Sequence, residues 1–383
     1  MMVQPLNDIL VLDFSTLLPG PLATLMLAEA GAEVVKLERP RTGEDARRTE
    51  PKIDGASIGY AILNRGKKSI ALDLKAEGAV ENLRPLIEKA DVLVEQFRPG
   101  VMDRLGLGYE AVRAVNPGIV YCSITGYGQS GPKRDIAGHD LNYVGDAGIL
   151  SLSRGPEEQP TTPFALVADV GGGTYPAVVN ILLALRERDR TGRGAHLDIA
   201  MADGAFVFAY WAHAKEIVAG EPIHNGADRL TGGLARYRLY TAADGRQIAV
   251  AALEEKFWQA FCNVIGLRAE LRDDLADPGA SIAEVAGLLA AHPASHWAPL
   301  LAEADCCCTV VKSPQEAAAD VHFANRGIFE WQVRIGERRV PALPVPIAPA
   351  FRAPPSREEA APDLGRHNRD FGLPPHERCC QKY

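Results

Sequence analysis

Three stretches of the sequence carry acid–base side chains in settings that suit catalysis, and the first of them contains His139. This histidine lies in the polar stretch AGHDLNY, residues 137–143, rather than on the apolar face of a helix. An imidazole has its ordinary pKa close to neutral pH, so it can accept or donate a proton there. Because most single histidines are structural, the alternative is that His139 only completes a loop.

The second stretch contains Asp169, which follows three apolar residues and precedes Gly171, Gly172 and Gly173. A helix is expected to begin at these glycines. A carboxylate in this position can act as a base or a nucleophile, and glycine N–H groups at the start of a helix can stabilise a developing oxyanion. The alternative is that Asp169 merely caps the helix.

The third stretch is LEEKFW, residues 253–258, which contains Glu254 at the end of an expected strand. A carboxylate at a strand end is available for chemistry. The alternative is a structural one, because the helix dipole favours a carboxylate where a helix starts.

Basic side chains gather in the first part of the chain, although the formal net charge of the protein is −8. Several follow expected strands, where the sheets of α/β proteins bind ligands. Arginine binds phosphate through paired hydrogen bonds, so the set is a candidate anion site; the alternative is a solvated charged face. The set comprises Lys36, Arg39, Arg41, Arg47, Arg48, Arg65, Lys67, Lys68, Arg98 and Arg104.

Composition excludes several classes of function. The chain has 383 residues, of which 47% are hydrophobic and 23% charged, as is usual for a soluble globular protein. The negative net charge argues against a nucleic-acid partner. No segment approaches the roughly 18 unbroken apolar residues of a transmembrane helix, and the N-terminus lacks the features of a signal peptide. A cytoplasmic location without a membrane partner is therefore expected.

The order of apolar and polar segments predicts an α/β domain over residues 1–200. Short apolar strands are expected at 9–12, 33–37, 69–72, 92–94 and 119–121, and helices of ordinary length separate them. This alternation is typical of a mostly parallel sheet. Neither the loop after the first strand nor the rest of the chain carries a glycine-rich dinucleotide or P-loop motif, so a site of either kind is not expected.

A second, smaller α+β domain is expected over residues 234–329. It follows a linker helix and connection at 201–233, and it opens with two strands around the turn AADGR, residues 242–246, which is typical of a hairpin. The remaining segment, residues 330–383, is rich in proline from residue 340 onward. We expect this segment to complete the large domain as extended chain.

Several motifs, taken in order, resemble the CaiB/BaiF-type family III CoA transferases, and most closely the α-methylacyl-CoA racemases of that superfamily. The resemblance covers nearly the whole chain. It rests on VLDF at 11–14, GAEVVKLERP at 31–40, NRGKKS at 64–69, FRPG at 97–100, TGYGQSGP at 125–132 and the stretch around Asp169.

The resemblance implies a large domain with a Rossmann-like parallel-sheet core, a smaller α+β domain, and two chains that interlock as a homodimer. The active site would lie between the large domain of one subunit and the small domain of the other. The resemblance also implies that Arg39, Arg65, Lys68 and Arg98 lie near the phosphates or adenine of an acyl-CoA substrate.

Two branches of this superfamily differ in their chemistry. In the transferases, the residue that matches Asp169 attacks the thioester, forms an acyl anhydride and frees CoA for a second acid. The racemases carry G-H-D-[IL]-N-Y, which residues 138–143 match, and a glutamate before a phenylalanine, which Glu254 matches. Glu255 departs from the pattern, since the racemases have proline there, and this puts the turn geometry at Glu254 in question.

The match favours racemisation or epimerisation of 2-methylacyl-CoA thioesters. His139 and Asp169 would then act as acid and base on opposite faces of C2, with Glu254 hydrogen-bonded to His139. The N–H groups of Gly171, Gly172 and Gly173 would face the enolate oxygen. No metal and no cofactor beyond the CoA of the substrate is required. CoA transfer through Asp169 is the alternative, a silent acyl-CoA binding protein is a third, and the acyl group stays open.

Overall fold

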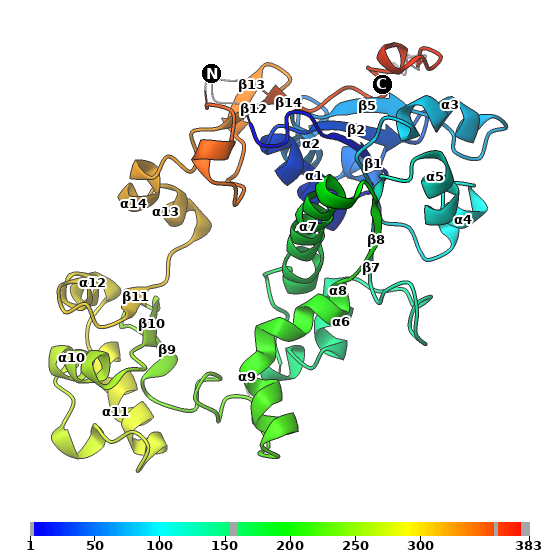
Figure 1. The fold of residues 1–383 in the computed structure, drawn as a ribbon. Coiled ribbons are helices and arrows are strands. Elements are labelled where there is room, and N and C mark those ends of the chain that lie inside the picture. Colours follow the sequence, from blue (N-terminus) through cyan, green and yellow to red (C-terminus); the bar gives the residue numbers. More distant parts are fainter. Residues whose placement is uncertain (1–3, 154–159, 356–358, 377–383) are drawn as a thin grey trace. The chain divides into compact units, whose positions relative to one another are not determined.

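Six parallel strands form the central sheet in the computed structural model, which describes residues 4–153, 160–355 and 359–376. Each strand is a short, largely apolar run, because a parallel sheet is covered on both faces. The expected α/β class and the expected strands are thus confirmed. In spatial order the strands are β5 (Lys68–Ala71), β2 (Glu33–Glu38), β1 (Leu10–Asp13), β6 (Val92–Glu95), β7 (Val120–Thr125) and β8 (Ala195–Ala200) (Figure 1).

The strand order reverses at the centre of the sheet. From β1 the chain moves outward through β2 to β5, and it then continues on the other side of β1 through β6, β7 and β8. Val11 of β1 accordingly pairs with Val34 on one side and with Val92 on the other. This is the order of the Rossmann fold, in which ligands bind outside the carboxyl ends of the strands at the reversal point. Asp13 and Glu95 are the last residues of the two central strands.

Helices cover both faces of this sheet. On one face, Leu83 and Leu107 pack with Leu12, Leu93 and Tyr121 in a hydrophobic core, and each of these five side chains is at most 2% exposed. The helices on that face are α3 (Ala79–Ile87) and α5 (Tyr109–Val115), and those on the opposite face are α1 (Pro19–Glu29) and α7 (Tyr175–Thr191). Shorter elements are the β3–β4 hairpin (Lys52–Ile53 and Ala56–Ser57), α2 (Ile58–Asn64), α4 (Val101–Arg104), α6 (Asp140–Asp146) and α8 (Met201–Ala205).

The C-terminal segment packs on the edge of the same unit. It forms a small sheet of β12 (Gln332–Ile335), β13 (Arg338–Pro341) and β14 (Glu359–Ala360). Val333 and Ile335 of this sheet bury Ala61 of α2. Farther along, the Asn368 side chain accepts the Ala71 N–H at 2.8 Å and donates to the Ala71 carbonyl at 3.1 Å, which satisfies the outer edge of β5.

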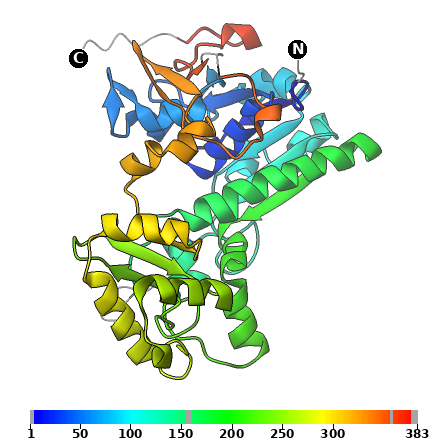
Figure 2. The same cartoon turned by 90° about the vertical axis from the view of Figure 1, so that its left-hand side faces the viewer.

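A second compact unit contains an antiparallel sheet in the order β11 (Cys308–Val310), β10 (Gln247–Ala251) and β9 (Tyr237–Thr241) (Figure 2). The hairpin expected between β9 and β10 is confirmed, and Gly245 adopts the left-handed φ of +80° that its turn requires. Trp258 and Phe261 are fully buried at the centre of this unit. Its main helices are α10 (Glu255–Ile265), α11 (Pro278–Ala290) and α12 (Ala294–Glu303), followed by the short α13 (Pro314–Ala318).

The two units are built from five segments of the chain. The first unit comprises Met1–Ala147, Ala165–Val207 and His322–Tyr383, and the second comprises Gly148–Phe164 and Phe208–Val321. This division differs from the expected domain boundaries mainly because residues 148–164 belong to the second unit. The expected linker helix is broken into α8, η5 (Phe206–Ala209), α9 (Tyr210–His213) and η6 (Ala214–Val218); α14 (Val321–Asn325) lies where the chain returns to the first unit.

One continuous helical segment, Val167–Thr191, is long and apolar enough to cross a membrane by length and composition. Ala177, Val178 and Ile181 of this segment are buried within the first unit. A helix that packs on a sheet passes the same test, so this segment fits the core helix of an α/β protein.

Candidate active site

The first turn of α6 presents His139 at its N-terminal end. The His139 side chain is exposed, and its backbone N–H donates to Asn142 Oδ1 at 3.0 Å. The Tyr143 hydroxyl donates to the Gly138 carbonyl at 2.6 Å. A Cβ added to Gly138 or to Gly126 would lie 2.6 Å from the Tyr143 ring, so both positions must be glycine. The residues of the GHDLNY motif therefore hold the backbone of His139 in place, and this sets the point from which its side chain extends.

Asp169 lies beside this turn, on the short π-helix η4 (Val167–Thr174) that runs into α7. Its backbone N–H donates to Asp140 Oδ1 at 2.9 Å, which joins η4 to α6. A single π-helical turn within a helix is uncommon and is frequent at functional sites. The sequence analysis expected an ordinary helix start here and a helix-capping role as the alternative for Asp169.

The environment of Asp169 raises the pKa of its carboxyl to about 6. Burial is the main cause, and the neighbouring Asp140 carboxylate adds to it, whereas the His139 side chain opposes the shift. A carboxyl with a pKa near 6 can both accept and donate a proton close to neutral pH. His139 therefore lies close enough to Asp169 for its charge to act on that carboxyl, and the role of the two side chains as an acid–base pair stays a prediction.

Packing requires glycine at two of the three positions that follow Asp169. A Cβ on Gly172 would overlap the Met201 carbonyl, and one on Gly173 would lie 2.9 Å from Met201 Cγ. This requirement concerns the missing side chains and not the N–H groups, so the oxyanion role of Gly171, Gly172 and Gly173 stays a prediction.

Glu254 lies in the second unit, directly before α10, and its side chain is exposed. It makes no capping hydrogen bond to the helix. The adjacent Glu255, by contrast, pairs with Arg236 at 3.1 Å and bonds to Gln259 at 2.7 Å. Glu255 is thus held by structural contacts, and the hydrogen bond from Glu254 to His139 stays a prediction.

A cavity of about 1130 Å³ opens at the carboxyl ends of β1, β2, β5 and β6. It lies beside the point where the strand order reverses, as expected for this fold. Four cationic and four acidic side chains line it together with apolar ones, and the acids are Glu38, Glu44, Asp45 and Asp73. The cations are Arg39, Arg41, Lys75 and Arg104, and the apolar residues include Phe14, Leu37, Leu72, Leu74, Phe97, Val101 and Leu105.

Arg39 is the one predicted CoA ligand that lines this cavity; it is exposed and pairs with Asp45 at 2.8 Å. Lys75 was missed by the sequence analysis. Its position a few residues beyond the carboxyl end of β5, which is the same edge that carries Arg39, was the signal that could have identified it.

Arg65 does not fit the predicted role. Its side chain is 1% exposed, and Nε and Nη2 bond to Glu29 Oε1 at 2.9 and 2.6 Å. Arg352 from the C-terminal segment binds the other oxygen of Glu29 at 2.7 Å. Arg65 is therefore a structural residue, because it is shielded from ligand and already paired with a buried carboxylate.

Lys68 also falls outside the cavity. It begins β5 at the amino edge of the sheet and pairs with Glu33 at 2.9 Å. The registers of β2 and β5 put it three residues, or about 10 Å, from the carboxyl edge. We therefore remove Lys68 from the CoA-binding set.

Arg98 lies on the side of Tyr143 rather than in the lining of the cavity. Burial and the Asp169 carboxylate raise the pKa of Tyr143, and the Arg98 guanidinium opposes that shift. The positive charge of Arg98 is thus directed toward the first turn of α6, and its contact with CoA stays a prediction.

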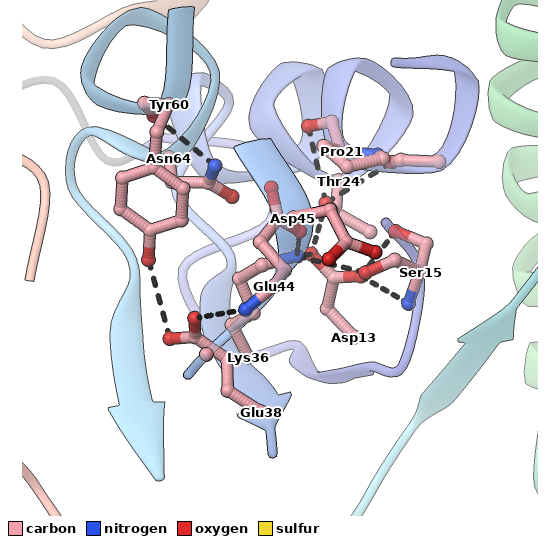
Figure 3. Close-up of polar contacts among 12 residues, drawn as sticks. Asp13, Ser15, Pro21, Thr24, Lys36, Glu38, Glu44, Asp45, Tyr60 and Asn64 are labelled. Atoms are coloured by element: carbon pink, nitrogen blue, oxygen red, sulfur yellow. Dashed lines mark hydrogen bonds and ion pairs between the residues drawn. The ribbon is translucent and has the colours of Figure 1, made fainter. Parts of the chain in front are cut away.

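Two further lysines of the basic set, Lys36 and Lys67, belong to a buried ionic network. Figure 3 shows Lys36 of this network with Asp13 and Glu44. Lys67 Nζ lies 3.1 Å from Asp13 Oδ2, and it also donates to three neutral oxygens. Lys36 Nζ lies 2.7 Å from Glu44 Oε2 in the loop that carries Arg39.

This network explains why Lys36 and Lys67 are not ligands. Burial lowers the pKa of Lys67 to about 8, against the attraction of Asp13. The two ammonium groups in turn hold the pKa of Asp13 well below its usual range, although burial opposes them. Both lysines are fully used within the protein: Lys36 holds the loop from β2 to Glu44, and Lys67 joins β1 to α1 and α2.

Comparisons with known proteins agree with this geometry. The model of CoA-transferase family III matches residues 6–368. The chain is 33% identical over 375 residues to the alpha-methylacyl-CoA racemase of Mus musculus, which covers 96% of this chain and 93% of that protein. It is 32% identical over 353 residues to the acetyl-CoA:oxalate CoA-transferase of Acetobacter aceti, covering 90% and 89%.

Among solved structures, Rv3272 from Mycobacterium tuberculosis superposes with a TM-score of 0.82 at 28% identity, covering 96% of this chain and 99% of that one. Racemases and transferases are about equally similar to the chain, so the comparisons establish the family and leave the reaction open. Together with the Rossmann strand order, these matches show that the chain belongs to the family III CoA-transferases.

Proposed function

We propose that the protein racemises or epimerises 2-methylacyl-CoA thioesters by exchange of the proton at C2. The observation that carries this proposal is the placement of His139 beside Asp169, whose pKa is raised to about 6. A transferase needs Asp169 alone, whereas exchange at a stereocentre needs an acid and a base on opposite faces of the carbon.

In the proposed reaction, one member of the pair removes the C2 proton and the thioester becomes an enolate. The other member donates its own proton to the opposite face, which inverts the centre. The pair therefore holds one proton in total before and after each turnover, and the direction of reaction decides which side chain carries it. Because Asp169 titrates near neutral pH, both arrangements are accessible.

The CoA moiety of the substrate would occupy the cavity at the carboxyl edge of the sheet. Arg39, Arg41, Lys75 and Arg104 supply the positive charge that its phosphates require. The reaction needs no metal and no redox cofactor. A cytoplasmic location without a membrane partner is part of the proposal.

We further propose that the protein acts as an interlocked homodimer in which Glu254 of the partner subunit orients His139. The outer face of α7 supports a second copy, because four large apolar side chains lie exposed one helical turn apart. They are Tyr175, Val179, Leu182 and Leu183, which are 41%, 54%, 42% and 61% exposed. Such a stripe on a helix is typical of a contact surface.

CoA transfer is the second candidate, and the half-buried Asp169 carboxyl favours it as well. The carboxylate would attack the thioester carbonyl, form an acyl–aspartyl anhydride and release CoA as the thiolate. The thiolate would then attack the aspartyl carbonyl, which releases the first acid and leaves CoA on Asp169 as a thioester. A second acid would attack this thioester to form a new anhydride and free the thiolate, which would attack the new acyl carbonyl, giving the second acyl-CoA and the free Asp169 carboxylate. This route gives His139 no role.

Proton NMR of a 2-methylacyl-CoA in D₂O, without an acceptor acid, separates the two candidates. We expect deuterium to enter C2 with loss of optical purity. If the C2 proton is retained while an added carboxylic acid becomes a CoA thioester, the protein is a transferase.

A further inference from the structure

Asp140 is a buried carboxylate that lies between the two members of the proposed pair in the structure, although only His139 is its neighbour in sequence. It is the first residue of α6, and its side chain is 7% exposed. Its Oδ1 accepts the backbone N–H of Asp169 at 2.9 Å. One hydrogen bond thus joins the turn that presents His139 to the turn that presents Asp169.

We propose that Asp140 is a positioning residue for Asp169, which it holds through the backbone N–H and through the charge of its own carboxylate. The inference rests on the proposed function, in which Asp169 exchanges the C2 proton. Asp140 faces the backbone of η4, so it acts through Asp169.

The cost of this arrangement argues that it has a purpose. A second buried carboxylate beside Asp169 disfavours the charged form of the Asp169 carboxyl. An asparagine would accept the same N–H without that cost, because its amide oxygen is also an acceptor. Only a negative charge at residue 140 raises the proton affinity of the Asp169 carboxylate, and a neutral asparagine would not do so.

The other groups around η4 do not supply this effect. Of the charged and titratable neighbours, Asp140 raises the pKa of Asp169 and His139 lowers it, after the larger effect of burial. The remaining titratable side chains on the elements that pack against η4 are Glu29 on α1, Tyr143 and Asp146 on α6, Tyr175, Arg186, Glu187, Arg188, Asp189 and Arg190 on α7, His196 and Asp198 on β8, and Asp203 on α8.

Two substitutions separate the hydrogen bond from the charge. Asp140→Asn keeps the acceptor and removes the charge, so the acid limb of the kcat profile for C2 exchange should move to lower pH. Asp140→Ala removes both, so kcat should fall about 100-fold through loss of alignment, while KM for the thioester changes little. Asp146→Asn, on the exposed end of the same helix, is the matched control and should leave the profile in place.

A titration that needs no turnover keeps this test independent of the reaction. Aspartate labelled with ¹³C at Cγ, with the Asp169 signal assigned from its absence in Asp169→Asn, reports the protonation of this carboxyl by NMR. In Asp140→Asn the Asp169 midpoint should fall below that of the wild type, whether the enzyme is a racemase or a transferase. An unchanged midpoint would overturn the inference, as would an Asp140→Ala variant with full kcat. If Asp140→Ala does not fold, the titration of Asp140→Asn decides alone.

Discussion

Gly172 and Gly204 face each other across η4 and α8, and neither has room for a side chain. A Cβ added to Gly204 would lie 2.6 Å from the Cα of Gly172, and one added to Gly172 would overlap the Met201 carbonyl. Asp169 lies only three residues before Gly172. The close approach of these two backbones therefore sets the position of Asp169 within the first unit.

Gly172→Ala should lower the stability of the protein by about 1 to 3 kcal/mol, because the added methyl group forces η4 and α8 apart. Exchange activity should fall with it, since Asp169 moves with η4. Thermal unfolding followed by circular dichroism measures the first effect. Gly59→Ala is the control: this exposed position on α2 has nothing within 3.8 Å of an added Cβ, so stability should be unchanged or higher. Equal melting temperatures for the two variants would contradict the packing argument.

Replacement by methionine should have different effects at Arg65 and at Arg39: the first substitution should lower stability and the second should weaken binding of the CoA thioester. Arg65→Met leaves Glu29 buried with one partner fewer, so we expect a loss of about 3 to 5 kcal/mol in stability. Arg39→Met should leave stability unchanged and raise KM for the CoA thioester about 10-fold, which is the effect of one lost charged hydrogen bond. Melting curves and KM values for both variants test this. An Arg65→Met protein that melts normally and binds CoA thioesters poorly would restore Arg65 as a ligand.

The rate of C2 exchange should fall on the acid side with a midpoint near pH 6. The pKa of Asp169 is raised to about 6, and at lower pH the pair binds a second proton, so both of its members are acids and neither can remove the C2 proton. An aspartate with its ordinary pKa of about 4 would instead keep the enzyme active to pH 5. Initial rates of deuterium incorporation from pH 4.5 to 8 locate the midpoint. If the rate instead falls with a midpoint near pH 4, burial does not raise the pKa of Asp169.

His139→Ala should reduce C2 exchange by about 100- to 10,000-fold, because one face of the carbon loses its acid–base group. Transfer of CoA to an added acid, if the protein catalyses it, should survive this change and be lost in Asp169→Ala. The two reactions are measured on the same preparations, with circular dichroism to verify folding. Full exchange in His139→Ala would end the racemase proposal.

The proposed dimer should depend on the apolar face of α7. Leu183→Glu places a charge in the exposed stripe, so it should shift the protein toward the monomer in size-exclusion chromatography with light scattering. Arg190→Ala, near the end of the same helix, is the matched control and should not change the mass. A wild-type protein that is monomeric at micromolar concentration would contradict the dimer directly.

The amino-acid sequence determined the fold class, and it identified His139 and Asp169 as a candidate acid–base pair. Apolar strands separated by helices predict a parallel sheet, because strands buried on both faces must be apolar along their length. Residues 138–143 also form hydrogen bonds with one another. Asn142 Oδ1 accepts the His139 N–H, and the Tyr143 hydroxyl donates to the Gly138 carbonyl. Contacts this local can be inferred from a motif.

Only the tertiary structure decided which of the similar residues are available for chemistry. Arg39 and Arg65 are the same side chain at the end of an element, but one lines a cavity and the other is buried on Glu29. Gly172 and Gly171 are neighbours, yet Gly172 is required by α8, which begins 29 residues later. Asp140 and Asp169 are likewise 29 residues apart and meet through one hydrogen bond. Desolvation and the distance between remote segments set these roles, and both arise only when the chain packs.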